Sequence, residues 1–349
     1  MATRPGILLV NLGSPASTSV ADVRKYLNEF LMDKNVIDIP WPLRRLLVSA
    51  FVLPTRPKQS AEAYKQIWLP EGSPLIHISR QLKDQVQIRT ELPVELGMRY
   101  GEPSTRRALQ ALQKRGIDQL RVIPLYPHYA MSSFGTAIEK IEEELKNLNW
   151  SVPLKVRRPF YADPDYIQAL VASAQEDLNT DYDHILFSYH GIPLRQVLKT
   201  DPTGKHCMQD PEGFPSCCHQ PSEAHHRCYR HQVYATTQAF VKAAGIPEDK
   251  YSISFQSRLG RTPWLRPYTD FVLPDLAKAG HKRVLIISPS FVSDCLETLE
   301  ELGVRGVELF TEAGGQTLQP IPCMNIHPQW VKTVVKWAES DSDYETVNA

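Results

Sequence analysis

The stretch Ile185-Leu-Phe-Ser-Tyr-His-Gly-Ile-Pro193 begins as a short apolar run and ends in a Gly-x-Pro that stops any strand. It predicts a buried strand with His190 just past its carboxyl end. Ligands bind at that edge in open α/β sheets, and histidine gains and loses its proton near neutral pH. His190 is therefore a candidate functional residue. A lone histidine after a strand is more often a hydrogen-bonded loop residue, so the stretch alone does not decide.

Strands alternate with helices along the chain, which predicts parallel sheets built from βαβ units. The apolar runs place strands at 6–11, 94–99, 120–125, 184–189, 251–255 and 283–288. Helical spacing of apolar residues covers 19–33 and recurs through Ile138, Ile141 and Leu145, and another helix begins at Asp294. The fold class is therefore α/β.

The two halves of the chain are similar in sequence. Residues 7–15 align without gaps on 185–193, and 121–127 align on 283–289, in the same order. We infer two similar domains that face one another, although two unrelated α/β halves would produce similar runs. His190 takes the place that Leu12 has in the first half, so the chemistry is expected on one side only.

Composition excludes several classes of protein. A chain of 349 residues predicts about two domains, and 42% hydrophobic with 22% charged residues is ordinary for a globular protein. The formal net charge is zero, so no general basic field favours nucleic acid. The first residues lack the apolar core of a signal peptide, and no apolar run approaches the roughly 20 residues of a spanning helix. We expect a soluble, cytoplasmic protein.

Three carboxylates follow the strand at 283–288. Asp294, Glu297 and Glu301 stand at i, i+3 and i+7, so an α-helix would present them on one face. This is again the ligand-binding edge of a sheet. The alternative is a capping arrangement, with Asp294 as the N-cap and Glu297 as its N3 partner.

Four cysteines lie within 22 residues. Cys207, Cys217, Cys218 and Cys228 follow His190 in a stretch with one glycine and several prolines, which predicts a loop. In a cytosolic protein such a cluster indicates a metal site rather than disulfides. Zinc is the default for four thiolates, but its usual signature is two C-x₂₋₄-C pairs, which this spacing lacks. Four free thiols without a metal are the alternative. Ligation by both cysteine and histidine also stays open, because several histidines lie nearby: His206, His219, His225 and His226.

Two further segments are unusual. Residues 36–56 contain two adjacent arginines among apolar residues, which suits a membrane surface, an entrance for an apolar ligand or an ordinary core helix. The acidic tail at 341–349 is expected to be flexible.

Five motifs together resemble the ferrochelatase family, over about residues 6 to 330. They are Leu8-Leu-Val-Asn-Leu-Gly-Ser-Pro15, Met98-Arg-Tyr-Gly101, Ser188-Tyr-His-Gly-Ile-Pro193, Phe255-Gln-Ser-Arg-Leu-Gly260 with Pro263-Trp-Leu265, and Ser293-Asp-Cys-Leu-Glu-Thr-Leu299. The resemblance implies insertion of Fe²⁺ into protoporphyrin IX, the last step of haem synthesis. It also implies two flavodoxin-like domains with parallel sheets facing a central porphyrin cleft. We place them at 1–158, completed by a helix at 326–340, and at 159–325, carrying the cysteine loop 199–230.

The resemblance also implies the site residues. His190 and Glu297 face each other across the macrocycle as catalytic and metal-binding groups, with Asp294 and Glu301 as an acidic relay. The porphyrin site would contain Leu12, Arg56, Ser73, Arg99, Tyr126, Trp264 and Phe291, with Tyr100 as a weaker candidate. Leucine at position 12 favours protoporphyrin over coproporphyrin. Cys295 stands where animal members have a second histidine, which weakens any scheme that needs two imidazoles.

Some bacterial members resemble this chain in holding a [2Fe–2S] cluster on four cysteines of an internal loop. We therefore prefer [2Fe–2S] to zinc on Cys207, Cys217, Cys218 and Cys228. Fe²⁺ and protoporphyrin IX are the expected substrates, with transient membrane contact through 36–56 and no nucleic acid as partner. The alternatives are a haem or porphyrin carrier without turnover, and a chelatase for coproporphyrin, sirohydrochlorin or another metal.

Overall fold

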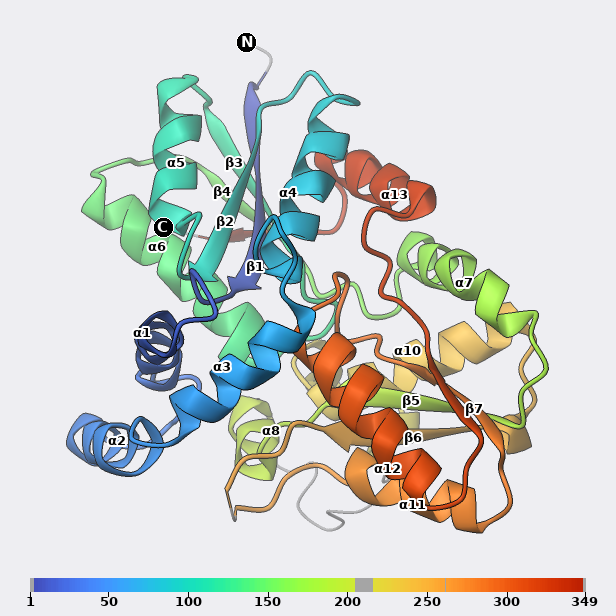
Figure 1. Ribbon diagram of the computed structural model, residues 1–349. Coiled ribbons are helices and arrows are strands. Elements are labelled where there is room, and N and C mark those ends of the chain that lie inside the picture. Colours follow the sequence, from blue (N-terminus) through green and yellow to red (C-terminus); the bar gives the residue numbers. More distant parts are fainter. Residues whose placement is uncertain (1–2, 205–215, 261, 348–349) are drawn as a thin grey trace. The chain divides into compact units, whose positions relative to one another are not determined.

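The computed structural model describes residues 3–204, 216–260 and 262–347 (Figure 1). The chain divides into two compact units. Unit 1 takes Met1–Tyr126, Met131–Arg158 and Val331–Ala349, and unit 2 takes Pro127–Ala130 and Pro159–Trp330.

Unit 1 contains a five-stranded sheet in the order β2-β1-β3-β4-β9, in which only β9 is antiparallel to its neighbour. Its strands are β1 (Pro5–Gly13), β2 (Val94–Tyr100), β3 (Gln119–Pro124), β4 (Leu154–Arg157) and β9 (Tyr344–Val347). Its helices are α1 (Val20–Leu31), α2 (Trp41–Leu46), η1 (Leu47–Val52), α3 (Arg56–Ile67), α4 (Pro74–Gln87), α5 (Thr105–Lys114), η2 (Met131–Gly135), α6 (Thr136–Asn147) and most of α13 (Pro328–Glu339).

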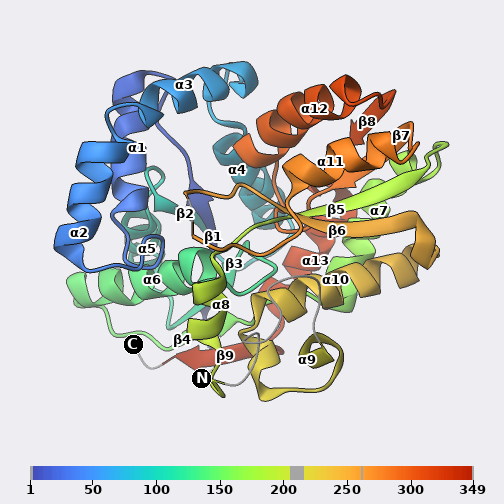
Figure 2. The same cartoon turned by 90° about the horizontal axis from the view of Figure 1, so that it is seen from below.

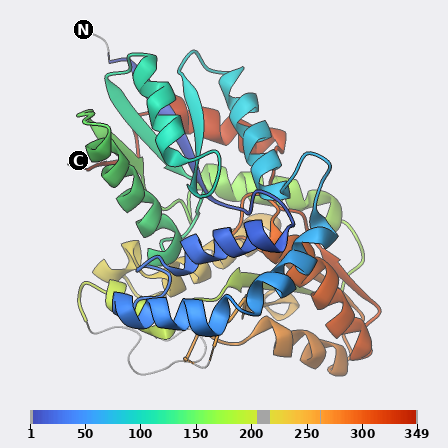
Figure 3. The same cartoon turned by 60° about the vertical axis from the view of Figure 1, so that its left-hand side comes forward.

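Both faces of the unit 1 sheet are covered, as a parallel sheet requires. Helices α5 and α6 lie on one face, and α4 and α13 lie on the other (Figures 1 and 3). Residues Ile7 to Val10 of β1 are accordingly fully buried. This explains why the strand reads as a continuous apolar run rather than an alternating one.

Unit 2 contains a four-stranded parallel sheet in the order β6-β5-β7-β8. Its strands are β5 (His184–His190), β6 (Tyr251–Gln256), β7 (Arg283–Ile287) and β8 (Thr317–Pro320). Its helices are α7 (Pro164–Leu178), α8 (Leu194–Thr200), α9 (Ser216–His219), η3 (Glu223–His226), α10 (Tyr229–Ala244), η4 (Glu248–Lys250), α11 (Thr269–Lys278), η5 (Glu297–Gly306) and α12 (Val307–Glu312). The predicted α/β class with parallel sheets is confirmed.

The order of β6-β5-β7-β8 repeats that of β2-β1-β3-β4. The aligned sequence stretches fall on equivalent strands, β1 with β5 and β3 with β7. In unit 2 the chain passes from β5 to β6 on one side of β5 and then crosses to β7 on its other side. The carboxyl ends of β5 and β7 therefore form a topological switch point of the sheet. His190 is the last residue of β5 and lies at that edge.

The unit 2 sheet is packed on both faces (Figure 2). Helices α11, η5 and α12 cover one face, where Leu186, Ile286 and Phe310 belong to one buried cluster. Helices α7 and α10 cover the other face, and Phe187 of β5 meets Phe240 of α10 there with ring centroids 5.3 Å apart.

Equivalent glycines stand at the carboxyl ends of β1 and β5: Gly13 is the last residue of β1, and Gly191 directly follows β5. A Cβ on Gly13 would lie 1.9 Å from the carbonyl oxygen of Tyr100, and one on Gly191 would lie 2.9 Å from that of Gln256. Gly13 also has a φ of +114°. Only glycine lets the chain turn this close to the neighbouring strand.

The C-terminal tail corrects one prediction. Residues Tyr344–Val347, expected to be flexible, form β9 and pair with β4. The acidic residues of the tail find cations: Asp341 pairs with Arg121 at 2.7 Å and with Lys155 at 3.0 Å. The composition of the tail alone predicted flexibility, because it does not reveal partners as distant in the sequence as Arg121 and Lys155.

The helix after β7 corrects another prediction. It is the π-helix η5, which begins at Glu297 rather than at Asp294. Its N-cap is Leu296, which makes no side-chain capping bond, so the capping alternative with Asp294 is wrong. A π-helix turns less per residue than an α-helix, so the predicted common face does not apply.

The segment 36–56 forms α2 and η1, with one buried and one exposed face. Val48 and Leu53 pack into an apolar cluster with Leu31 of α1. The exposed large side chains are Trp41, Leu43, Leu46, Leu47 and Phe51. Within the described ranges, no helix combines the length and apolar character that crossing a bilayer requires.

Asp33 is the buried anion that joins α1 to the sheet of unit 1. Its carboxylate accepts from the Arg99 guanidinium, from Thr136 and, at 2.8 Å, from the Tyr100 hydroxyl. Burial raises the pKa of Asp33, but the hydrogen bonds from Thr136 and the Asn35 backbone and the charge of Arg99 hold that pKa below its ordinary value. Asp33 therefore stabilises the fold in its ionised form.

The substitution Asp33→Asn should lower the free energy of unfolding by about 3 kcal/mol at neutral pH, because it leaves the Arg99 charge without its buried partner. The folded-state pKa of Asp33 is lowered, so its contribution is present above the unfolded pKa of about 4 and is lost as pH falls through the folded value. Urea unfolding followed between pH 7 and pH 3 should show the gap between the two proteins narrowing in acid.

The matched control is Glu62→Gln. Glu62 pairs with Lys65 at 2.9 Å, and both side chains are exposed, so this variant should stay within about 0.5 kcal/mol of the parent. Equal losses for the two variants would contradict the role given to Asp33.

Candidate active site

His190 lies half-buried at the carboxyl end of β5, and its ring orientation is set locally. Its Nδ1 is 2.6 Å from the carbonyl oxygen of Gly191, which can only accept a hydrogen bond. Nδ1 therefore carries the proton in the neutral ring, and Nε2 keeps its lone pair. The ring meets Phe291 edge to face, with centroids 6.2 Å apart. A neutral imidazole held in this tautomer can accept a proton or bind a metal ion.

Gln256, at the end of β6, joins the segments of His190 and Glu297. It is the register partner of His190 in the parallel ladder. Its side-chain oxygen accepts from Ser188 at 2.7 Å and from Ser288 at 3.0 Å. Its Nε2 donates to the main-chain oxygen of Glu297 at 2.9 Å. This amide therefore fixes the first residue of η5 against the strand that carries His190.

Glu297 is half-buried at the start of η5, beside the thiol of Cys295. Burial, with a further contribution from Glu297, raises the pKa of Cys295 well above its ordinary value. The thiol is therefore neutral at physiological pH and acts as a hydrogen-bond donor. Cys295 does not replace a second imidazole as a base.

The carboxylates of Asp294 and Glu301 each bond to neighbouring segments of the chain. Asp294 accepts from Thr298 Oγ1 at 2.9 Å and from Asn325 Nδ2 at 2.6 Å. Glu301 accepts from the amide of Ser257 at 2.9 Å and from its hydroxyl at 2.5 Å. Ser257 has a φ of +66°, which a non-glycine residue rarely adopts, so these bonds stabilise an unfavourable turn.

The four predicted metal-site residues thus lie in one unit, on β5, on η5 and in the segment before η5. In the parts of the chain that the structure describes, no three His, Cys, Asp or Glu side chains converge as metal ligands. The arrangement gives His190 and Glu297 one shared support in Gln256.

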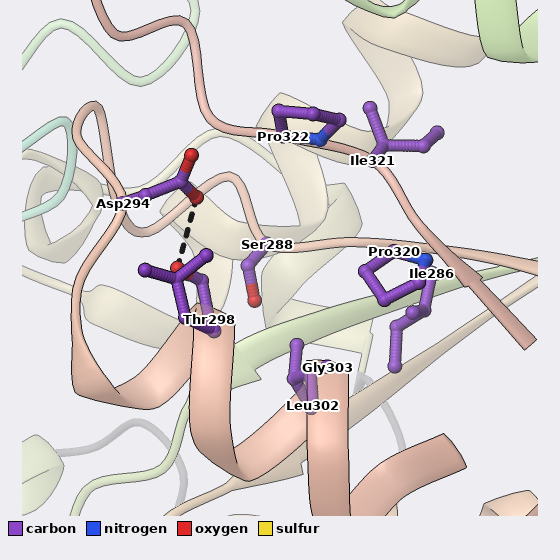
Figure 4. A pocket seen from close by; sticks show the side chains of 10 residues that line it. Ile286, Ser288, Asp294, Thr298, Leu302, Gly303, Pro320, Ile321 and Pro322 are labelled. Carbon is purple, nitrogen blue, oxygen red and sulfur yellow. Dashed lines mark hydrogen bonds between the residues drawn. The ribbon is translucent and has the colours of Figure 1, made fainter. Parts of the chain in front are cut away.

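A pocket of about 180 Å³ opens behind the start of η5 (Figure 4). Asp294 and Thr298 lie at one end of it, joined by their hydrogen bond. The rest of its lining is mostly apolar and comes from Ile286, Ser288, Leu299, Leu302, Gly303, Pro320, Ile321 and Pro322. The pocket adjoins the carboxylate segment but contains neither His190 nor Glu297.

Two predicted porphyrin residues lie in unit 2. Phe291 contacts the His190 ring as described. Trp264 packs beside the turn after His190, because it forms a bridge with Pro193 and its ring lies 3.3 Å from the Cβ position of Gly191. Its indole Nε1 donates to the Leu259 oxygen at 3.0 Å, which fixes the ring.

The other predicted porphyrin residues lie in unit 1. Leu12 is half-buried near the end of β1, and Arg56 is exposed at the start of α3. Ser73 is buried at the N-cap of α4 but makes no side-chain cap bond. The Arg99 guanidinium is already engaged by Asp33, and its Nε donates to Thr136 at 2.7 Å. The weaker candidate Tyr100 donates to the same carboxylate.

Tyr126 is the notable member of this group. Its side chain is buried, and burial raises its pKa, so the hydroxyl is neutral. Within the described residues that hydroxyl has no hydrogen-bond partner, and neither has the buried hydroxyl of Ser14. Buried hydroxyls normally bond to protein, water or ligand. These two hydroxyls, near the end of the unit 1 sheet, can therefore each still form a hydrogen bond.

The cysteine loop 199–230 is described only in part, because Cys207 lies outside the described residues. Cys217 is half-buried, and Cys218 and Cys228 are buried. The expected loop contains two short helical pieces, α9 and η3, in its described part. Its donor chemistry, thiols shielded from water, fits an iron–sulfur cluster or zinc.

Sequence reasoning missed three residues that contact the His190 backbone or its strand. Gln256 is its register partner, the Tyr229 hydroxyl donates to its main-chain oxygen, and Ser290 Oγ accepts from its amide. Gln256 was visible as part of the Phe255-Gln-Ser motif, and Tyr229 as the residue after Cys228. Their roles depend on contacts between strands and helices that no local pattern encodes.

Comparisons with known proteins identify the family of this chain. The family model described as Ferrochelatase matches residues 4–342. The ferrochelatase of Pseudomonas fluorescens (strain SBW25) is 51% identical over 334 residues, which cover 95% of this chain and 96% of that protein. The ferrochelatase of Stutzerimonas stutzeri (strain A1501) is 51% identical over 336 residues, covering 96% and 97%.

Solved structures show the same fold at low identity. SirB from Bacillus subtilis with Fe³⁺ has a TM-score of 0.54 and 13% identity, covering 95% of this chain and 93% of that one. The sirohydrochlorin chelatase SirB from Bacillus subtilis subspecies spizizenii, in complex with cobalt, has a TM-score of 0.51 and 12% identity, covering 96% and 93%. The family match and the half-identical relatives extend over nearly the whole chain, and the chain belongs to the ferrochelatase family.

Proposed function

We propose that this chain inserts Fe²⁺ into protoporphyrin IX to give protohaem, the last step of haem synthesis. The observation that carries the assignment to particular residues is the fixed tautomer of His190, whose Nδ1–H is held by the Gly191 carbonyl at 2.6 Å. Metallation must remove two pyrrole protons, and the Nε2 lone pair that this tautomer leaves free can accept a proton.

Glu297 is the proposed guide for the metal. A carboxylate suits a ferrous ion that still carries water, and Gln256 fixes the backbone of Glu297. Asp294 and Glu301 complete the proposed acidic relay. A carboxylate offers about four lone-pair positions, so each keeps accepting capacity beyond the bonds that anchor it.

The proposed porphyrin-binding residues come from both units. Trp264 and Phe291 offer apolar surface beside His190 in unit 2, and Leu12 and Tyr126 are the proposed apolar contacts in unit 1. Arg56, Ser73 and Arg99 are the proposed polar contacts for the propionates. Of the two arginines, Arg56 is the exposed one, so it offers a charge that is not committed to a buried partner.

We further propose that Cys207, Cys217, Cys218 and Cys228 hold a [2Fe–2S] cluster. The support is their donor set and the burial of Cys218 and Cys228. Metallation changes no oxidation state, so the cluster would supply structural cross-linking or sensing rather than electrons. Zinc on the same thiols is the alternative.

The protein is proposed to work in the cytoplasm, at the surface of the inner membrane. The support is the exposed apolar face of 36–56, where Trp41 is 61% and Phe51 69% exposed. The two arginines of this segment serve the fold instead, because Arg44 is buried against the carbonyls of Ile37 and Ile39, and Arg45 donates to Asn28. Binding of this segment to the membrane would therefore be driven by burial of its apolar side chains more than by the charge of its arginines.

The first test is anaerobic incubation with Fe²⁺ and protoporphyrin IX, coproporphyrin or sirohydrochlorin, followed by visible spectroscopy. Protoporphyrin should be the best substrate. The variant His190→Ala should lose at least about a hundredfold in kcat, the lower end of the usual contribution of general acid–base catalysis. His281→Ala, which removes a histidine from the opposite end of the unit 2 sheet, should keep parental activity. Near-normal turnover by His190→Ala would sink the assignment.

The cluster has its own spectroscopic test. Anaerobically purified protein should absorb in the visible through thiolate-to-iron charge transfer and should contain acid-labile sulfide. The variant Cys228→Ser should lose this absorbance. The variant Cys323→Ser should retain it, because Cys323 is a buried cysteine outside the loop 199–230. Protein that lacks both visible absorbance and sulfide would rule the cluster out, and stoichiometric zinc would favour the alternative.

Membrane contact is tested by co-sedimentation with anionic and zwitterionic vesicles. Phe51→Glu should weaken binding about tenfold, because burying an aromatic side chain contributes about 1.5–3 kcal/mol. Ile88→Glu is the matched control, since Ile88 is 72% exposed but lies outside segment 36–56. Absence of vesicle binding, or equal weakening by both variants, would contradict the proposed surface.

A further inference from the structure

Tyr229 is the first residue of α10 and follows the last cysteine of the cysteine segment, residues 217–228. Its side chain is buried, and its hydroxyl donates to the main-chain oxygen of His190 at 2.7 Å. The same hydroxyl lies 3.0 Å from Ser290 Oγ. Ser290 Oγ in turn accepts from the His190 amide at 3.3 Å. Two hydroxyls thus satisfy both backbone polar groups of His190.

The sheet itself cannot supply these bonds on the β7 side. The parallel register of β5 with β7 ends at Phe187 and Ile287, three residues before His190. On the other side, β6 still pairs through Gln256. Tyr229 and Ser290 therefore continue the hydrogen bonding of β5 beyond the end of the ladder, at the residue proposed to move protons.

The ring of Tyr229 is held by uncharged packing. His128 meets Tyr229 and Tyr189 edge to face, with centroids 5.7 Å and 5.5 Å away. Burial lowers the pKa of His128 to about 3, so this imidazole is neutral at physiological pH. His128 Nε2 bonds the Thr236 hydroxyl of α10 at 2.9 Å. The start of α10 is thus fixed against the strand that carries His190.

The same helical turn holds the cysteine segment. Gln232 is fully buried, and its Nε2 donates to the main-chain oxygens of His225 and His226, both at 3.0 Å. The backbone amide of Gln232 donates to the main-chain oxygen of Cys228 at 3.1 Å. His231 Nδ1 lies 2.8 Å from the Cys218 oxygen. One turn of helix therefore carries the hydroxyl that holds His190 and the groups that hold the cysteine segment.

We propose that Tyr229 is a positioning residue for His190, and that through it the state of the cysteine segment changes the orientation of the imidazole. The proposal rests on the proposed function of His190 as a base. It needs no particular metal on the cysteines, because the link consists of protein groups alone.

The variant Tyr229→Phe removes only the hydroxyl. We expect kcat to fall about tenfold, which corresponds to about 1.4 kcal/mol, while the KM for porphyrin stays within about twofold. The Nδ1–H and Nε2 resonances of His190, observed with ¹⁵N-histidine labelling and assigned with His190→Ala, should shift or broaden.

The matched control is Tyr189→Phe. Tyr189 is equally buried, contacts the same His128, and bonds Thr237 at 2.8 Å instead of the His190 backbone. It should lose similar thermal stability without the change in kcat or in the His190 resonances. Ser290→Ala provides a second variant, and its effect should be less than additive with that of Tyr229→Phe. Equal behaviour of the two tyrosine variants would overturn the positioning role.

Coupling to the cysteine segment is tested with Cys217→Ser. This variant should shift the His190 resonances in the parent and leave them unchanged in the Tyr229→Phe background. The same shift in both backgrounds, or in neither, would overturn the coupling. If the parent inserted no iron, the proposed function would fail, whereas the resonance comparison would still decide the role of Tyr229.

Discussion

The side-chain amide of Gln256 bonds to β5, to Ser288 just after β7 and to η5 at once, and it does so while buried. It is 3% exposed, so each lost bond would leave a polar group without water, at a cost of about 1–3 kcal/mol. The backbone oxygen of Gln256 also accepts from the Gly191 amide at 2.8 Å. The proposed base and the proposed metal guide are thus located by one side chain that neither substrate needs to contact. Precision at this edge comes from the sheet rather than from a loop.

The two units share a strand order but differ at the edge where ligands bind. In unit 2 that edge has the imidazole and carboxylates. In unit 1 the equivalent position is Leu12, and the nearby polar groups are hydroxyls such as those of Tyr126 and Ser14. This agrees with a division in which unit 2 performs the proposed chemistry and unit 1 supplies binding surface. Function depends on the residues placed on a fold, so two units with one strand order can carry different side chains at this edge.

The sequence predicted those parts of the fold whose cause is local. Continuous apolar runs located six strands to within a few residues, and the repeat anticipated the common strand order. It missed β4, β8 and β9, which are four residues each and too short for periodicity to reveal. It also predicted an α-helix in place of η5, because the bonds between Glu301 and Ser257 join η5 to the turn after β6, which is distant in the sequence. His190 was visible, whereas Gln256 and Tyr229 act through contacts that only the folded chain creates.

Strand β9 has a consequence for how the protein is made. Unit 1 starts at the N-terminus, yet its sheet is completed by β9, and Arg121 is paired by Ala338 and Asp341 near the other end. During synthesis, β4 therefore waits as an unpaired edge, with its backbone groups open to other chains. Both segments of unit 2, Pro127–Ala130 and Pro159–Trp330, emerge before β9, so unit 2 can fold before unit 1 is complete. The proposed catalytic half can thus mature before the half that begins the chain.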